Sequence, residues 1–71
     1  MPTSTLRDLL TNREFEVLNE LHNGYSNGEI AEQLLLSEGT VGNHINVILH
    51  KLQVEDRTQA AILAVKYGLG K

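Results

Sequence analysis

The stretch SEGTVGNHINVILHKL, residues 37–52, decides the fold, because its apolar residues recur at the spacing of one helical face. Its first residue, Ser37, is of a type that caps helix N-termini. Up to Lys51 the stretch contains no lysine or arginine. The pattern predicts a helix of about fifteen residues with one buried face, formed by Val41, Ile45, Ile48, Leu49 and Leu52.

A capping box predicts the first of the helices that come before this stretch. In TNRE, Thr11–Glu14, the threonine hydroxyl can accept from the backbone N–H of the glutamate, while the glutamate side chain reaches back to the threonine. Gly24 is a typical residue to end a helix. The first helix is therefore predicted to run to about Asn23, with its apolar face formed by Val17, Leu18 and Leu21.

The remaining helices have similar start signals. SNGE, Ser26–Glu29, repeats the capping-box spacing and predicts a short second helix with Ile30 and Leu34 as its apolar stripe. A turn of about three residues, 35–37, then leads into the long helix. DRTQ, residues 56–59, is predicted to open a last helix that closes at Gly68. Because no β-type alternation of useful length and no internal repeat occurs, the sequence predicts an all-α chain.

The length and composition fit one small domain. The chain has 71 residues, 41% of them hydrophobic, and no cysteine, so disulfides and thiolate metal sites are excluded. Residues 1–9 are aperiodic and are predicted to be a flexible N-terminal segment or linker. No apolar run approaches the roughly 18 residues that span a bilayer, and the start of the chain does not resemble a signal peptide. We therefore expect a cytoplasmic protein with no membrane association.

A short helix, a tight turn and a longer helix form a helix-turn-helix. Ala31 supports this interpretation, because a small residue lets the two helices approach closely. In such a unit the longer helix is presented to the major groove of DNA. The net charge of −3 argues in the other direction, because domains that bind nucleic acid are usually basic.

Three segments resemble, in order and spacing, the LuxR-type (FixJ/NarL-type) DNA-binding domain of bacterial transcription regulators: LTNREFEVLNEL, GYSNGEIAEQLLLSEGTVGNHINVILHKL and VEDRTQAAILAVKYGL. The resemblance runs from Leu10 to Leu69. It implies an all-α, four-helix bundle at residues 10–69, with the helix-turn-helix at about residues 27–46. It also implies sequence-specific DNA binding in transcription regulation. Members of the family usually carry this domain behind an N-terminal receiver or ligand-sensing domain, so the chain would be that effector domain, either cut from a two-component response regulator or standing alone.

The resemblance also implies which residues contact the bases. Base reading in the family centres on the positions of Gly42, Asn43 and Asn46, and His44 falls near the same face. An asparagine amide can pair with N6 and N7 of adenine in the major groove. The alternative is that these are ordinary exposed polar residues.

The chain departs from the family pattern where the family is basic. Gly28, Gly39 and Gly42 stand where lysine or arginine is common, and His50 replaces a frequent arginine. Each phosphate neutralised by a cation contributes to affinity through counterion release. We therefore expect weak non-specific binding and a shallow dependence on salt.

Phosphate contacts can also come from hydroxyls, amides and the N–H groups at helix N-termini, which bind anions without a cationic side chain. The alternative is that the uncharged candidates only cap their helices and that the cations are simply solvated. The expected contacts to the DNA backbone are Ser26, Asn27, Thr40, Lys51 and Arg57.

The last helix is apolar on more than one side, and a helix of that kind must be buried on more than one side. In the resembled family this helix pairs two copies on DNA. We therefore expect a homodimer on an inverted-repeat site in double-stranded DNA; the alternative is an ordinary exposed alanine and leucine face. The expected dimer interface consists of Ala61, Ile62, Leu63 and Val65.

The alternative function is a protein-interaction module on the same fold, with DNA binding weakened or lost. An acidic surface is compatible with that alternative, and its expected members are Glu14, Glu16, Glu20, Glu32 and Glu38. An enzyme is not expected, because no nucleophile–base pair is visible and the chain lacks room for a substrate cleft. No metal or other cofactor is expected, since the three histidines do not share the i, i+4 spacing of a metal site.

Overall fold

Four helices are found in residues 9–66, the part of the chain that the computed structural model describes: α2 (Asn12–His22), α3 (Asn27–Leu34), α4 (Glu38–Leu52) and α5 (Arg57–Lys66). No strand occurs in that part, so the all-α prediction is confirmed there. The predicted end of the last helix at Gly68, and the predicted N-terminal segment up to residue 8, lie outside the described residues.

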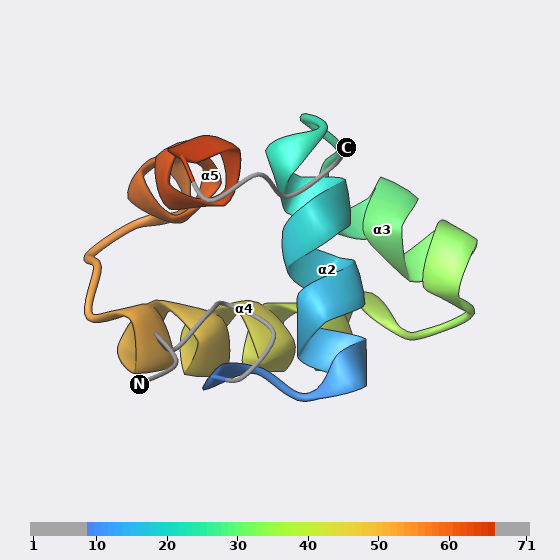
Figure 1. Ribbon diagram of the computed structural model, residues 1–71. Coiled ribbons are helices and arrows are strands. Elements are labelled where there is room, and N and C mark those ends of the chain that lie inside the picture. Colours follow the sequence, from blue (N-terminus) through green and yellow to red (C-terminus); the bar gives the residue numbers. More distant parts are fainter. Residues whose placement is uncertain (1–8, 67–71) are drawn as a thin grey trace.

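The central helix of the bundle is α2, which contacts each of the other three helices. It crosses α4 and separates α3 from α5, while α4 also packs against both of its chain neighbours (Figure 1). The helix-turn-helix, α3 and α4, thus rests on α2, and α5 closes the remaining side.

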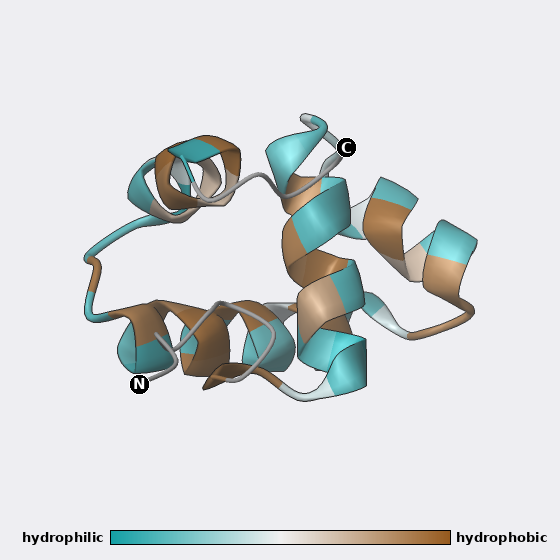
Figure 2. Ribbon diagram, in the orientation of Figure 1, coloured by the Kyte–Doolittle hydropathy of each residue, from teal (hydrophilic) through white to brown (hydrophobic). Residues whose placement is uncertain are grey.

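The core contains the centres of the apolar faces predicted for the first three helices, and Leu34, Leu49 and Leu52 are partly buried against it. The ribbons of α2, α3 and α4 show hydrophobic and hydrophilic stretches in alternation, as amphipathic helices do (Figure 2). From α5, two alanines reach the core and permit a close approach to α2 and α4. The largest fully buried side chains are Val17, Leu18, Ile30, Val41 and Ile48.

The predicted start signals are confirmed as caps. The backbone N–H of Glu14 donates to Thr11 Oγ1 at 3.1 Å, and that of Thr11 donates back to Glu14 Oε1 at 3.0 Å. Ser26 and Glu29 form the same reciprocal pair at the start of α3. These two capping boxes satisfy N–H groups that the helices themselves leave without partners.

The starts of α4 and α5 have the first hydrogen bond of a capping box but lack the reciprocal one. Thr40 N–H donates to Ser37 Oγ at 3.1 Å, and Gln59 N–H donates to Asp56 Oδ1 at 3.0 Å. The Gln59 side chain accepts instead from the N–H of Glu55, one residue before the cap. Both helices therefore begin where the sequence predicts.

The turn of the helix-turn-helix occupies residues 35–37, as predicted. The backbone of its first residue, Leu35, has the left-handed helical conformation. Leu35 has φ 59° and ψ 43°, and its side chain is 91% exposed. Glycine or asparagine is the usual residue in this conformation. The reversal brings Leu36 against the core and places Ser37 at the start of α4.

Within residues 9–66, no helix has the length and apolar character needed to cross a membrane.

Candidate nucleic-acid interface

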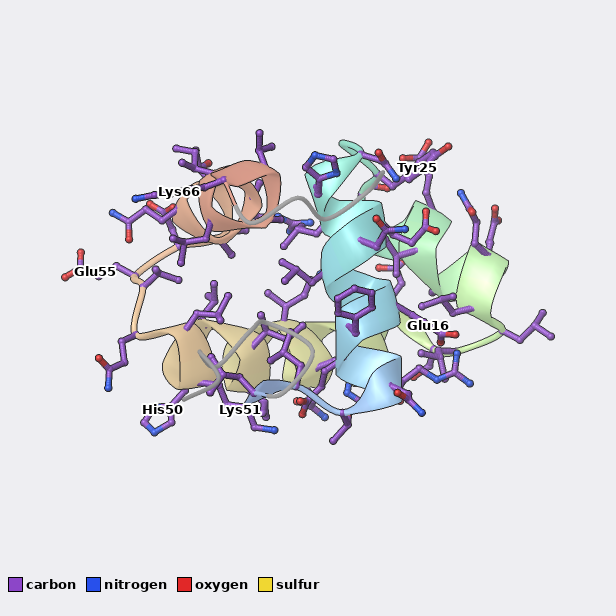
Figure 3. The ribbon with its side chains drawn as sticks, in the orientation of Figure 1. Glu16, Tyr25, His50, Lys51, Glu55 and Lys66 are labelled. Atoms are coloured by element: carbon purple, nitrogen blue, oxygen red, sulfur yellow. The ribbon has the colours of Figure 1, made fainter. Side chains whose placement is uncertain are left out.

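The outer face of α4 carries the residues predicted to contact bases. Asn43 and Asn46 are exposed, and Gly42 and His44 are partly exposed, whereas the intervening Ile45 is buried. Figure 3 shows His50 projecting from α4 on the side away from α5. The core thus covers one side of α4 and leaves a polar side uncovered.

The two glycines of α4 do not interrupt the helix. A Cβ added at Gly42 would meet no atom within 4 Å, and one added at Gly39 would meet only Ser37 Oγ at 3.9 Å. No close packing therefore requires a glycine at either position. Gly28 differs, because a Cβ there would come within 2.9 Å of Glu38 Oε2, at the flexible end of that side chain.

Three of the predicted phosphate-binding residues gather around one hollow. Ser26, Asn27 and Arg57 line it, where the end of α2 and the starts of α3 and α5 come together. Tyr25, Thr58 and the acidic Glu29 line the same hollow. Asn27 Oδ1 is buried without a hydrogen-bond partner. The hollow therefore joins two helix N-termini and a guanidinium at one place on the surface.

Thr40 lies apart from that hollow, in the first turn of α4. Its hydroxyl oxygen accepts a hydrogen bond from Ser37 Oγ at 2.9 Å. A hydroxyl has one proton to donate in addition to its two acceptor positions. The Thr40 hydroxyl can therefore accept from the capping residue Ser37 and still donate to a phosphate oxygen.

Lys51, the lysine expected to bind phosphate from α4, is paired with a carboxylate. Its Nζ lies 2.8 Å from Glu14 Oε1, across 37 positions of sequence. The Lys51 side chain is 34% exposed and that of Glu14 only 9%. The ion pair joins the first turn of α2 to the last turn of α4.

The ionisation of Glu14 depends on this pair. Burial raises the pKa of Glu14, but hydrogen bonds from Lys51 and from the Thr11 N–H, with the nearby charges of Lys51 and His44, outweigh it and hold the pKa below its ordinary value of 4.5. The prediction that Glu14 belongs to an exposed acidic surface is therefore wrong, because its carboxylate is turned into the structure to reach both donors.

The predicted dimer residues divide into two groups. Ala61 and Leu63 are partly buried, whereas Ile62 is 60% exposed and Val65 is 62% exposed. Ala60 and Ala64 form the side of α5 that faces the core. The helix thus has an apolar outer side that the described residues leave open to solvent.

The described part of the chain is poor in positive charge. Its lysines and arginines are Arg13, Lys51, Arg57 and Lys66, against eight aspartates and glutamates. Arg13 is also paired, with Glu16 at 3.1 Å. Within residues 9–66, no group of three histidine or acidic side chains could hold a metal ion. Because acidic residues outnumber lysines and arginines in this part of the chain, its long-range attraction of DNA phosphates is weak.

The family model for bacterial regulatory proteins of the luxR family matches residues 8–64. The chain belongs to the luxR family. It is a DNA-binding domain of the helix-turn-helix class, which confirms the resemblance and the general function predicted from the sequence. The predicted bounds of the domain, residues 10–69, remain a prediction.

The relatives are regulators several times longer than this chain. The transcriptional regulatory protein LnrK of Bacillus subtilis is 60% identical over 60 residues, which are 84% of this chain and 27% of that protein. DegU of Brevibacillus brevis is 52% identical over 84% of this chain and 25% of its own length. The response regulator VraR of Staphylococcus aureus is 47% identical over 90% of this chain and 31% of its own length. The chain thus spans about a quarter to a third of these relatives.

Proposed function

We propose that this domain reads a specific DNA sequence by placing α4 in the major groove. The observation that carries the proposal is the exposed polar face of α4, where Asn43 and Asn46 stand three residues apart. Both amides project from the side that the core leaves uncovered, and each can form a bidentate pair with adenine. His44 and Gly42 flank them, His44 as a further donor and Gly42 as a point of close approach to the DNA.

Contacts to the DNA backbone come mainly from uncharged groups. Ser26, Asn27 and Arg57 hold one phosphate at the hollow between α2, α3 and α5, and Thr40 donates to another from the start of α4. Because few cations take part, we expect a weak non-specific affinity and a shallow salt slope.

Two copies bind an inverted repeat through their α5 helices. The exposed Ile62 and Val65, with the partly buried Ala61 and Leu63 beside them, supply the apolar contact. Pairing doubles the number of base and phosphate contacts and so offsets the shortage of charge. A twofold arrangement of α4 helices requires a site with matching symmetry.

The domain acts as the DNA-binding part of a longer response regulator in the cytoplasm. Support comes from the relatives, of which VraR is named a response regulator and LnrK a transcriptional regulatory protein. A receiver or sensor domain N-terminal to this segment would control the pairing of α5. The role is one of binding, with no catalytic step.

The proposal is tested by fluorescence anisotropy with a labelled library of inverted-repeat duplexes, titrated at low and moderate salt. The wild type is expected to select a sequence, and Asn46→Ala is expected to lose about tenfold or more in affinity for it, since one bidentate base contact contributes about 1–3 kcal/mol. Gly42→Lys is expected to bind tighter, because its side chain extends into open space beside the groove.

The matched control is Asn23→Ala, which makes the same chemical change at an exposed asparagine at the end of α2. It should bind as the wild type does. If neither the wild type nor Gly42→Lys binds any duplex, while the chain captures a defined protein through Ile62, the domain is a protein-interaction module and the proposal fails.

A further inference from the structure

The long helix of the helix-turn-helix has one lysine and no arginine, and that lysine is already paired. Lys51 donates to Glu14 Oε1 at 2.8 Å, and the same oxygen accepts from the backbone N–H of Thr11 at 3.0 Å. Every other side chain that α4 could offer to a phosphate is uncharged or a histidine. The fate of this one ammonium therefore decides how much charge α4 brings to DNA.

Glu14 holds Lys51 more firmly than a surface carboxylate would. Its side chain is only 9% exposed, so water reaches it less than it reaches a surface carboxylate, and an uncompensated carboxylate at a buried position is strongly unfavourable. Its position is fixed in addition by the capping box with Thr11. A DNA phosphate, in contrast, is exposed to water. Leaving a phosphate without a lysine partner therefore carries no comparable cost in free energy.

We propose that Glu14 withholds Lys51 from the DNA backbone, so that the domain binds DNA without a lysine contact from α4. The inference rests on the proposed function, because it assigns a role in DNA binding to a residue that does not touch DNA. Glu14 is a positioning residue in this account: it keeps the Lys51 ammonium over the first turn of α2. Removing its charge would release the ammonium to a phosphate.

A purely structural role for the pair makes a different prediction. If the pair only ties α2 to α4, neutralising Glu14 would change the stability of the domain and leave the number of phosphates neutralised by the protein unchanged. That number is measured by the slope of log affinity against log salt concentration, which changes by about 0.9 for each phosphate contact. The salt slope therefore separates the two roles.

The first variant is Glu14→Gln, because glutamine keeps the capping box: its side-chain oxygen can still accept from the Thr11 N–H. We expect a salt slope steeper by about 0.9, so that raising salt from about 50 to about 200 mM weakens the variant about 3.5-fold more than the wild type. The control is Glu20→Gln, which removes the same charge from the same helix. It should change the affinity slightly and the slope by much less.

The second comparison removes the lysine in both backgrounds. Lys51→Gln is expected to leave the salt slope of the wild type unchanged, whereas in the Glu14→Gln background it should cancel the gain in slope completely. Circular dichroism and thermal unfolding establish that each variant is folded before its binding is measured. The effects of Lys51→Gln on the salt slope in the two backgrounds form a double-mutant cycle. The difference between these two effects measures the coupling between Glu14 and Lys51.

The inference is overturned if Glu14→Gln has the salt slope of Glu20→Gln, or if Lys51→Gln flattens the slope of the wild type by a full phosphate contact. In both cases the wild type still binds DNA, so the proposed function survives. If neither the wild type nor Glu14→Gln binds any duplex, the proposed function fails and the inference fails with it.

Discussion

At Glu14 one carboxylate serves two partners that are far apart in the sequence. Its bond to the Thr11 N–H is local and follows from the spacing of a capping box. Its bond to Lys51 Nζ spans 37 positions and depends on how α2 crosses α4. The first was predictable from four residues, and the second was not, because no periodicity in either helix specifies where the two helices cross.

The lowered pKa of Glu14 predicts how the stability of the domain depends on acid. A carboxyl group whose pKa is lower in the folded than in the unfolded chain stabilises the fold above its ordinary pKa of 4.5, and this contribution is lost as the pH falls through the folded value. We therefore expect the free energy of unfolding to decline below pH 4.5. In Glu14→Gln that part of the decline should be absent.

Urea unfolding at a series of pH values between about 7 and 3 measures this difference. Glu16→Gln is the comparison, because it removes an exposed carboxylate from α2 and leaves Glu14 in place. It should retain the decline. A Glu14→Gln variant that loses stability in acid as steeply as Glu16→Gln would show that the ion pair does not stabilise the fold.

At the scale of elements, α4 forms in spite of its composition. Two glycines stand in its first five residues, and each costs about 1 kcal/mol relative to alanine in a helix interior. The cap at Ser37 and the burial of Val41, Ile45 and Ile48 offset that cost. The prediction of the helix from its apolar spacing was correct because packing of that face, more than intrinsic propensity, decides helical stability.

Replacing Gly42 by alanine should stabilise the domain. The added Cβ meets no atom within 4 Å, so only the gain in helix propensity remains, about 1 kcal/mol. For a domain of this size that is a rise in melting temperature of about 4–8 °C. Thermal unfolding followed by circular dichroism measures it.

Gly24→Ala provides the opposite case, because Gly24 has φ +91° and an L-residue is strained there. It should lower the melting temperature although nothing lies within 4 Å of the new Cβ. A Gly42→Ala variant that melts lower than the wild type would mean that the start of α4 is not the regular helix described above.

The turn between α3 and α4 has one feature that its local sequence predicts and one that it does not. Its length of three residues was predicted from the two capping signals that flank it. Its left-handed residue was not, because leucine disfavours that conformation. The conformation is imposed from both sides: the N–H of Leu36 bonds to the carbonyl of Ala31 at 2.8 Å, and the Leu36 side chain must reach the core.

At the scale of the whole molecule, the candidate site was predicted in parts and not as an arrangement. The face of α4 with Asn43 and Asn46 follows from helical spacing once the core residues are known. The meeting of Ser26, Asn27 and Arg57 around one hollow does not, since it depends on the way α3 and α5 both pack on α2. Sequence spacing identifies residues on one helix, and only the fold relates residues on different helices.

Pairing through α5 predicts a sharp effect of charge at its outer side. Ile62→Asp should abolish cooperative binding of two copies to an inverted repeat and lower the affinity for that duplex about 100-fold, because the gain from two linked binding events is lost. Binding to a duplex with one half-site should be unchanged. Sedimentation of the protein–DNA complex, together with anisotropy on both duplexes, measures stoichiometry and affinity.

The half-site duplex is the internal control of this experiment, because an unfolded variant would fail on both duplexes. If Ile62→Asp binds the inverted repeat as two copies with undiminished affinity, the pair forms elsewhere on the surface. If the half-site is also lost, Ile62 supports the fold itself.

The open space beside Gly42 has a consequence for changing what the domain recognises. Folding places no demand on a side chain at this position, since none of the core contacts involve it and an added Cβ meets nothing. Helix-compatible residues can therefore be introduced at Gly42. The exposed positions of Asn43 and Asn46 can be varied in the same way. A library randomised at these three sites would change the DNA sequence that the domain prefers without changing its ability to fold. The domain would then serve as a scaffold for selecting new DNA targets.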